Sequence, residues 1–317
     1  MNYSTAIKGC CHWQTTALIT LALALGACGG GSGGGGSNVP PPAPPPVAQG
    51  PSIVNYPSGL TVAFNTKVGT GGVTNLVWSD EFNGPGLGPD WFADSGDGSQ
   101  YGLVGWGNNE LQWYQPGNAQ ITAGNLVITA REEMQSGYNY TSARIITRDN
   151  FAFRYGRIEA RIRLPGGQGL WPAFWLLSQD DAYGTWAASG EIDVMEAINL
   201  NGTGGNNIYG TIHYGGPFPG NLSSGQPYNV ASSATGNFHV YALEWDQFEM
   251  RWYVDGILYS TRNSWSSSAA AYPAPFDQPF YILLNVAVGG NWPGAPDVTT
   301  SFPVTMEVDY LRVYSGG

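Results

Sequence analysis

Three acidic side chains lie close together in one short segment, and their types and spacing suit acid–base chemistry. Between Ser189 and Ala197 the chain carries Glu191, Asp193 and Glu196, separated by apolar residues. This composition predicts a β-strand with one buried face. Two carboxyl groups about 5–5.5 Å apart, one ionised and one protonated, perform retaining glycoside hydrolysis. A solvated acidic strand or a metal site would have the same composition, so this segment alone leaves those alternatives open.

The spacing of the three acids also predicts an irregularity in their strand. In a regular strand Glu191 and Asp193 share one face, whereas Glu196 points to the other. One extra residue near Val194 and Met195, a β-bulge, would return Glu196 to the face of the other two acids. Three neighbouring carboxylates repel one another, which raises the pKa of at least one and keeps it protonated near neutral pH.

Two tryptophans ahead of the acids have the spacing of a sugar-binding platform. Trp171 and Trp175 share one face of a predicted strand with Ala173 between them, whereas Phe174 and Leu176 point to the other face and a core. Exposed indoles at this spacing would stack on the apolar faces of sugar rings. The alternative is that both tryptophans belong to the core, where this residue type is common.

Three more residues are candidates for the same site. Trp186 comes just before the acids and could line a groove beside them. His213 ends a predicted strand, and a lone histidine is more often structural than catalytic. Arg144 could hold a substrate hydroxyl or simply pair with an acid.

The elements that must position these residues are predicted to be strands. Gly156–Leu164 alternates apolar with charged side chains, which is typical of a half-buried strand, and Asp255-Gly256 predicts a tight hairpin within Phe248–Tyr259. Further short strands are expected at Asn125–Ala130, Ser142–Thr147, Ile208–His213, Phe280–Val286 and Glu307–Val313. Many short strands without helices between them predict an all-β sandwich or barrel.

The N-terminal segment is expected to be an export signal followed by a tether. The apolar run Thr15–Leu25 is too short to span a membrane, and Ala27-Cys28 ends a stretch that resembles the bacterial lipoprotein box. We expect residues 1–27 to form a signal peptide, Cys28 to be lipidated, and residues 28–52, rich in Gly, Ser and Pro, to form a tether.

The protein would then be an outward-facing cell-envelope lipoprotein. A plain signal peptide and a secreted protein are the alternative. Residues 53–75 are an N-terminal extension of uncertain structure.

Composition excludes several classes of protein. The chain has 23 acidic and 12 basic side chains, and this acidic balance argues against a nucleic-acid partner. Charged residues make up 11% and aromatic residues 13%, which excludes a disordered or coiled-coil protein. Beyond the first 28 residues no apolar run is long enough to span a bilayer, so the lipid at Cys28 is the expected membrane contact. A monomer is the default expectation.

A series of motifs follows in order along the chain. It comprises Trp78-Ser79-Asp80-Glu81-Phe82-Asn83-Gly84, Gly105-Trp106-Gly107-Asn108-Asn109-Glu110-Leu111-Gln112, Tyr140-Thr141-Ser142-Ala143-Arg144-Ile145, Tyr155-Gly156-Arg157-Ile158-Glu159-Ala160-Arg161, Gly169–Trp175, Gly190–Glu196 and Asn285-Val286-Ala287-Val288-Gly289-Gly290-Asn291-Trp292-Pro293-Gly294. With this series the chain resembles glycoside hydrolase family 16, and within it the laminarinase-type endo-β-1,3-glucanases, over about Val77–Tyr314.

The resemblance implies a fold and a mechanism. Residues 76–317 would form a two-sheet β-jelly-roll sandwich with an open concave substrate cleft. Glu191 would be the nucleophile and Glu196 the acid/base, with Asp193 hydrogen-bonded to Glu191. The substrate would be a β-1,3-glucan, and catalysis would need no cofactor.

The resemblance implies further roles that match less specifically. The sugar subsites would be lined by Trp171, Trp175, Trp186, Asn109, Arg144 and His213. A structural calcium ion would be held by Glu81, Asp309 and the backbone of Gly124, because calcium prefers hard oxygen ligands. The chain departs from the family's pattern at the Gly/Ser/Asn-rich insertion Tyr214–Thr235, which we expect to form a loop beside the cleft that modifies specificity.

Two kinds of alternative remain. One is another substrate of the same family, namely mixed-linkage glucan, agarose or carrageenan; the net charge of −11 disfavours a sulfated polyanion. The other is a non-catalytic glycan-binding lectin on the same fold. A pure lectin has no use for paired carboxylates, so the presence of both Glu191 and Glu196 argues against it.

Overall fold

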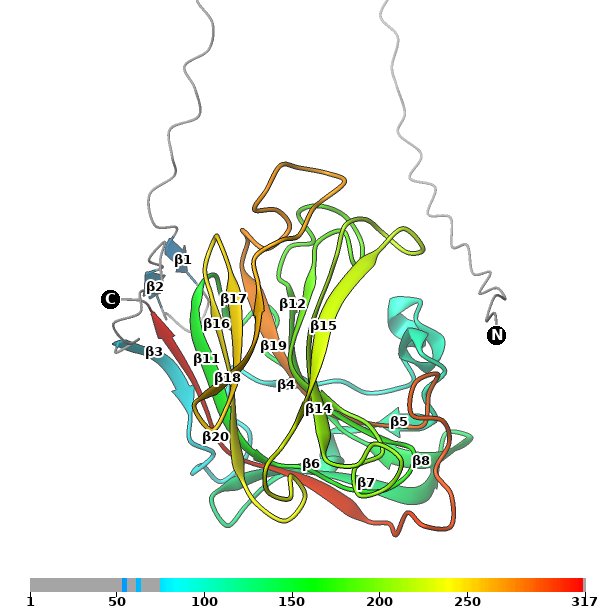
Figure 1. Ribbon diagram of the computed structural model, residues 1–317. Coiled ribbons are helices and arrows are strands. Elements are labelled where there is room, and N and C mark those ends of the chain that lie inside the picture. The colour runs from blue at the N-terminus through cyan, green and yellow to red at the C-terminus, as the bar shows by residue number, and fades with distance from the viewer. Residues whose placement is uncertain (1–52, 56–60, 64–74, 316–317) are drawn as a thin grey trace, which may run out of the picture. The chain divides into compact units, whose positions relative to one another are not determined.

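The computed structural model describes residues 53–55, 61–63 and 75–315 (Figure 1). Two units are distinguished along the chain, Met1–Gly50 and Pro51–Gly317, and all described residues belong to the second. The expected signal peptide, Cys28 and the whole expected tether, residues 28–52, lie outside the described residues. Within the part that is described, no helix is long and apolar enough to cross a membrane.

Strands make up nearly all regular structure in the described residues, in two main sheets. The eight-stranded sheet has the order β15-β14-β13-β12-β19-β9-β4, and β10 pairs with β19 beside this path. Its strands are β4 (Phe92–Ala93), β9 (Arg144–Ile146), β10 (Ala152–Phe153), β12 (Leu170–Ser178), β13 (Glu191–Ala197), β14 (Asn207–Tyr214), β15 (Leu222–Asn229) and β19 (Phe280–Val288).

The ten-stranded sheet has the order β18-β17-β16-β11-β20-β7-β8-β5, with β3 paired to β20 and β6 paired to β7. Its strands are β3 (Asn75–Asp80), β5 (Gln112–Tyr114), β6 (Ala119–Thr122), β7 (Asn125–Gln135), β8 (Tyr138–Ser142), β11 (Gly156–Arg163), β16 (His239–Trp245), β17 (Met250–Val254), β18 (Ile257–Arg262) and β20 (Val304–Ser315). The remaining elements are the hairpin of β1 (Ile53–Asn55) with β2 (Thr61–Ala63) and the short 3-10 helices η1 (Ser99–Tyr101), η2 (Val104–Gly107) and η3 (Pro116–Asn118).

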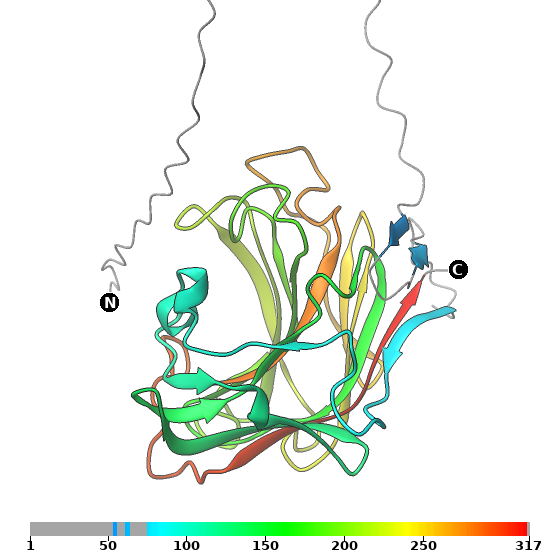
Figure 2. The same cartoon turned by 180° about the vertical axis from the view of Figure 1, so that it is seen from behind.

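The two sheets pack face to face around one apolar core, as the views from the front and from behind show (Figures 1 and 2). Ile158 and Ile162 of β11 point into this core from one sheet, and Phe174 and Leu176 of β12 point into it from the other. All four side chains are fully buried. Each such side chain stabilises the fold by about 1.5–3 kcal/mol relative to an exposed one. The period-two pattern of the sequence is therefore the pattern of core contact, and the predicted all-β jelly-roll sandwich is confirmed.

The expected strands are present with modest changes of boundary, and one expected loop is not a loop. Within Tyr214–Thr235, residues Leu222–Asn229 form β15, which pairs with β14 from Asn207↔Asn229 to Tyr214↔Leu222. The segment is polar because β15 is the edge strand of its sheet and most of its side chains are exposed. The polar composition of this segment therefore marks a strand at the edge of the sheet. The prediction of a loop over the whole segment was wrong.

Candidate active site

The strand β13 contains the bulge that the spacing of its acids predicts. On β12, Phe174 pairs with Met195 and the next residue, Trp175, pairs with Asp193, so Val194 is the extra residue. Val194 and Met195 are both buried in the core. Because two successive residues point to the core, the residues after them face the opposite side from the one that a regular strand would give them. Glu191, Asp193 and Glu196 therefore share the sheet face that points away from the core. We call this the site face; it also carries Trp171 and Trp175 of β12 and His213 of β14.

The bulge is fixed from the core side by a tryptophan of the opposite sheet. The indole N–H of Trp252 on β17 donates a hydrogen bond of 2.8 Å to the backbone carbonyl of Asp193. Trp252 reaches this carbonyl because Gly210 of β14 has no side chain; a Cβ there would lie 2.5 Å from the indole ring. A bulge leaves ladder groups unpaired, and a buried unpaired carbonyl is costly, so this hydrogen bond stabilises the irregular strand.

Each catalytic candidate accepts a hydrogen bond from an indole. Trp171 Nε1 donates to Oε1 of Glu196 at 2.8 Å, and Trp186 Nε1 donates to Oε2 of Glu191 at 2.8 Å. Trp171 comes from the neighbouring strand β12, whereas Trp186 lies in the loop before β13 and is 40% exposed. An indole nitrogen can only donate, so each contact orients one oxygen of its carboxylate.

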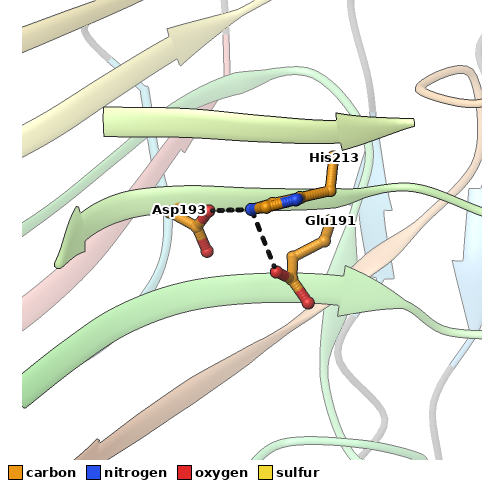
Figure 3. A group of neighbouring side chains, drawn as sticks. All are labelled: Glu191, Asp193 and His213. Carbon is orange, nitrogen blue, oxygen red and sulfur yellow. Dashed lines mark ion pairs between the residues drawn. The ribbon is translucent and has the colours of Figure 1, made fainter. Parts of the chain in front are cut away.

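His213 joins two of the acids (Figure 3). Its Nε2 lies 3.3 Å from Oδ2 of Asp193 and 3.7 Å from Oε1 of Glu191. We expected Asp193 to hydrogen-bond Glu191 directly. Among the described side chains, the contact that links the two carboxylates is instead the imidazole between them, because two anions in one buried site need a shared cation. The histidine, which sequence reasoning treated as more often structural, thus belongs to the site.

The two glutamates differ in acidity. Burial raises the pKa of Glu191 to about 7, and the nearby charge of Asp193 adds to the rise, whereas His213 and the Trp186 hydrogen bond oppose it. Burial also raises the pKa of Glu196 well above its usual value, and the charges of Asp193 and Glu191 act in the same direction. Glu196 faces the charges of two carboxylates, whereas Glu191 has the His213 imidazole beside it, so these surroundings favour the proton on Glu196.

The imidazole of His213 holds its proton strongly. Burial by itself lowers the pKa of His213, but the hydrogen bond with Asp193 and the charges of the surrounding acids outweigh it and raise the pKa to about 10. The ligand atoms of Glu191, Asp193 and His213 lie within 4.8 Å of one another, so this group could hold a metal ion. Such an ion would have to displace the His213 proton, because a metal binds only neutral imidazole.

Trp175 is held on the site face by two contacts. Its indole N–H donates to Oδ1 of Asn285 on β19 at 2.7 Å. The Arg144 guanidinium lies 5.1 Å from its ring centroid and 4.4 Å from that of Trp106. Arg144 also pairs with the buried carboxylate of Asp94 at 3.1 Å. Of the two roles expected for Arg144, pairing with an acid is therefore observed, and the guanidinium also fixes the tryptophan platform.

Asn109 lies on the segment between η2 and β5. Its side-chain amide donates to Oδ1 of Asn291 at 2.8 Å, which ties this segment to the loop after β19. Both views show these two segments side by side (Figures 1 and 2). Trp292, the next residue in that loop, packs edge-on against Trp171 with 5.4 Å between ring centroids, and Tyr209 packs against Trp292 at 5.0 Å.

Sequence reasoning missed four residues of this site, namely Asp94, Tyr209, Asn285 and Trp292. Asn285 and Trp292 stand inside one of the motifs on which the resemblance rests, which is the signal that could have found them. Asp94 and Tyr209 stand in no motif. They reach the site only because β4 pairs with β9 and β14 pairs with β13.

The residues expected to hold calcium are engaged with arginines. Glu81 accepts two hydrogen bonds of 2.8 Å from Arg312, and Asp309 pairs with Arg161 at 2.6 Å. Gly124 lies in the turn between β6 and β7. In this arrangement each of the two carboxylates is paired with an arginine, and the calcium site stays a prediction.

Comparison with known proteins gives consistent matches over the described sheets. A protein curated as "Glucan endo-1,3-beta-glucosidase A1" from Niallia circulans is 43% identical over 259 residues, covering 76% of this chain and 38% of the relative. A "Beta-1,3-glucan-binding protein" from Penaeus monodon is 43% identical over 191 residues, covering 51% of this chain and 50% of the relative. The chain thus spans half or less of the length of these curated relatives.

A solved structure and a family profile match the same part of the chain. The laminarinase catalytic domain from Thermotoga maritima MSB8 is 41% identical with a TM-score of 0.68, and the match covers 76% of this chain and 97% of that domain. The profile of the glycosyl hydrolases family 16 matches residues 106–312, which include the bulged strand and all three of its acids. Sequence, fold and site geometry agree, and the chain belongs to the glycosyl hydrolases family 16.

Proposed function

We propose that this chain is a retaining endo-glycosidase that hydrolyses the β-1,3-glucosidic links of laminarin-like glucans. One observation carries the proposal. Glu191 and Glu196 share the site face, each accepts an indole hydrogen bond, and their surroundings make Glu196 the weaker acid. A pair of carboxyl groups with separated acidities is the requirement for retaining glycoside hydrolysis.

The first step forms a covalent intermediate. Glu196 gives its proton to the glycosidic oxygen while a carboxylate oxygen of Glu191 attacks the anomeric carbon. The bond from that carbon to the leaving oxygen breaks, the shortened glucan departs as an alcohol, and the remaining sugar is an ester of Glu191. Its ionisation near pH 7 makes Glu191 the nucleophile, and the higher pKa of Glu196 makes it the proton donor.

The second step regenerates both groups. Glu196, now a carboxylate, takes a proton from a water molecule whose oxygen attacks the anomeric carbon. The ester bond breaks, Glu191 leaves as a carboxylate, and the product keeps its original anomeric configuration. Two carboxyl groups and water suffice for this sequence, so no step requires a cofactor.

His213 and Asp193 adjust the charge of the nucleophile. The His213 imidazolium contacts both Asp193 and Glu191 and offsets one negative charge. This lowers the pKa of Glu191 and keeps part of its carboxyl group ionised near neutral pH. Asp193 in turn holds the proton on His213. When Glu191 becomes an ester and loses its charge, the Asp193–His213 pair remains neutral overall, so neither of these two residues has to gain or lose a proton in that step.

The substrate class is supported by the relatives and by the site face. The Thermotoga structure is described as a laminarinase domain and the Niallia relative as an endo-1,3-β-glucosidase. Trp171, Trp175 and Trp186 are only partly buried and can stack on sugar rings. A relative described as a glucan-binding protein has the same identity as the Niallia enzyme, so identity alone does not separate hydrolysis from binding. The two glutamates with unequal acidities favour hydrolysis.

The location of the protein belongs to the same proposal. We expect residues 1–27 to direct export and Cys28 to carry a lipid that anchors the protein on the outward side of the envelope. The folded part would act as a monomer. Mass spectrometry of the mature N-terminus tests the anchor: a lipidated Cys28, absent after Cys28→Ser, is expected, and an unmodified N-terminus elsewhere would contradict it.

Product analysis tests the activity. Purified protein and its Glu191→Gln variant are incubated separately with laminarin, lichenan, agarose and κ-carrageenan. Short oligosaccharides from laminarin with wild type, and none with the variant, are expected. Products from another glycan alone would keep the mechanism and reassign the substrate. No products from any of the four, together with retained binding of laminarin, would favour the lectin.

A further inference from the structure

Glu110 is a buried carboxylate that the mechanism above does not use. It lies between η2 and β5, is 8% exposed, and pairs through its backbone with Gly289 just after β19. Its Oε2 lies 2.7 Å from Nε2 of Gln112 and 3.4 Å from the Tyr114 hydroxyl, and its Oε1 lies 3.3 Å from Nδ2 of Asn108. Burying a carboxyl group is costly unless it is hydrogen-bonded, and three donors surround this one.

These contacts continue from Glu110 to the tryptophan platform. The Tyr114 hydroxyl lies 3.1 Å from Nδ2 of Asn285, and Oδ1 of Asn285 accepts the indole N–H of Trp175 at 2.7 Å. Tyr114 and Asn285 are both buried. A continuous chain of hydrogen bonds therefore joins Glu110 to Trp175 on the site face.

The direction of this chain follows from donor chemistry. An indole nitrogen can only donate, so the oxygen of the Asn285 amide must face Trp175 and its NH₂ group must face Tyr114. The Tyr114 hydroxyl thus accepts from Asn285, and its own proton must point to an acceptor. That acceptor is Oε2 of Glu110. An apolar residue at position 110 would leave the last donor of the chain buried and unpaired.

We propose that Glu110 is a positioning residue for sugar binding, which acts through Tyr114 and Asn285 to hold Trp175 in its binding orientation. The proposal rests on the proposed function in that Trp175 is taken as a sugar platform. Glu110 also orients Asn108, next to Asn109, so one buried carboxyl links two separate parts of the expected sugar site. The catalytic carboxylates make none of these contacts.

The test compares three variants that differ in which link they break. Glu110→Leu removes the acceptor. Tyr114→Phe removes a single oxygen one link further along and keeps the carboxylate, so it remains informative if the leucine variant folds poorly. Glu110→Gln is the conservative variant, because its carbonyl can take the place of Oε2 while Asn108 turns its amide to accept from the new NH₂. Glu133→Leu is the control at an exposed carboxylate: Glu133 also accepts from neutral donors, Gln115 and Thr141, but makes no hydrogen bond to Tyr114, Asn285 or Trp175.

The first readout is the kinetics on the glycan that wild type hydrolyses. If the Trp175 indole is no longer held in place, we expect the free energy of sugar binding to weaken by about as much as one neutral hydrogen bond contributes. Glu110→Leu and Tyr114→Phe should therefore raise KM about five- to tenfold. The kcat should change less than about twofold, because an interaction made equally in ground and transition state affects binding alone. Glu110→Gln and Glu133→Leu should match wild type. Equal losses in kcat with unchanged KM, or a defect in Glu110→Gln as large as in Glu110→Leu, would overturn the proposal.

The second readout is a double-mutant cycle with Trp175→Phe, which removes the indole N–H. If Glu110 acts through Trp175, Glu110→Leu should have little further effect on KM in the Trp175→Phe background. Additive losses would overturn the proposal.

The third readout needs no substrate, so it separates this proposal from the assignment of the glucan. The indole N–H resonance of Trp175 is identified by its loss in Trp175→Phe, and its exchange with solvent is measured in each variant. Faster exchange in Glu110→Leu and Tyr114→Phe, with wild-type exchange in Glu133→Leu, is expected whatever the glycan. Unchanged exchange in both chain-breaking variants would overturn the positioning role even in an active glucanase. An absence of products with altered exchange would instead count against the glucanase assignment.

Discussion

The indole N–H of Trp171 donates a 2.8 Å hydrogen bond to Oε1 of Glu196, from the strand that pairs directly with β13. Trp186 makes the equivalent contact with Glu191 from a loop. Each indole stabilises the ionised form of its glutamate and so lowers the pKa of that group. The two contacts should therefore control opposite limbs of the pH–activity profile.

Trp171→Phe should move the basic limb to higher pH. Activity falls on that limb when Glu196 loses its proton, and removing the indole hydrogen bond raises the pKa of Glu196 further. The pH profile of kcat/KM, which reports the groups of the free enzyme, is the measurement. A basic limb that stays in place or moves to lower pH would contradict the assignment of Glu196 as the acid.

Trp186→Phe should move the acidic limb to higher pH. On that limb activity rises as Glu191 ionises, with a pKa near 7 in the wild type, and the lost hydrogen bond raises this pKa. The same kinetic profile measures it, and the Trp171 variant is the matched control because it loses the same kind of contact. If both variants moved the same limb, the division of roles between the glutamates would be wrong.

The stability of the protein should fall as pH rises through neutrality. The folded-state pKa of His213 is about 10 against an ordinary value of 6.5, so its stabilisation is complete below pH 6.5 and is lost as pH rises toward 10. The pKa of Glu191 is raised from 4.5 to about 7, so its contribution to stability also falls as pH rises between those two values. Denaturant unfolding at several pH values measures this. His213→Gln should flatten the dependence between pH 6.5 and 10, and an equally steep dependence in that variant would refute the attribution to His213.

Trp252→Phe should weaken both the fold and the catalytic strand. It removes the hydrogen bond to the Asp193 carbonyl at the bulge, and a buried unpaired carbonyl costs about 1–3 kcal/mol of unfolding free energy. The kcat should also fall, because the bulge sets the face of Glu196. Trp245→Phe is the control. Trp245 is equally buried, but its Nε1 has no hydrogen-bond partner among the described residues, so losing this N–H group should leave the free energy of unfolding unchanged or raise it. Equal losses in the two variants would show that ring volume, not the hydrogen bond, accounts for the effect.

Local pattern alone was enough to predict much of this protein. Alternation in Gly156–Leu164 predicted β11, and the Asp255-Gly256 turn predicted the hairpin of β17 and β18. The five-residue step from Glu191 to Glu196 predicted a bulge, because side chains in a strand alternate with a period of two. These features depend on neighbours in the chain, so the sequence contains them directly.

Tertiary structure decided which residues meet across strands. His213 is 20 or more positions from Glu191 and Asp193, and no local pattern places its imidazole between them; the pairing of Glu191 with His213 on β13 and β14 does. Asp94 reaches Arg144 through a two-residue strand, and Glu110 reaches Trp175 through two intervening side chains. The acidities of Glu191 and Glu196 belong to the same class of property, since they come from burial and from charges that only the folded sheet brings together. The sequence by itself therefore determined the strands and the acids they carry. The contacts that support the proposed roles of the two glutamates, nucleophile and acid, depend on long-range pairing that a linear pattern does not encode.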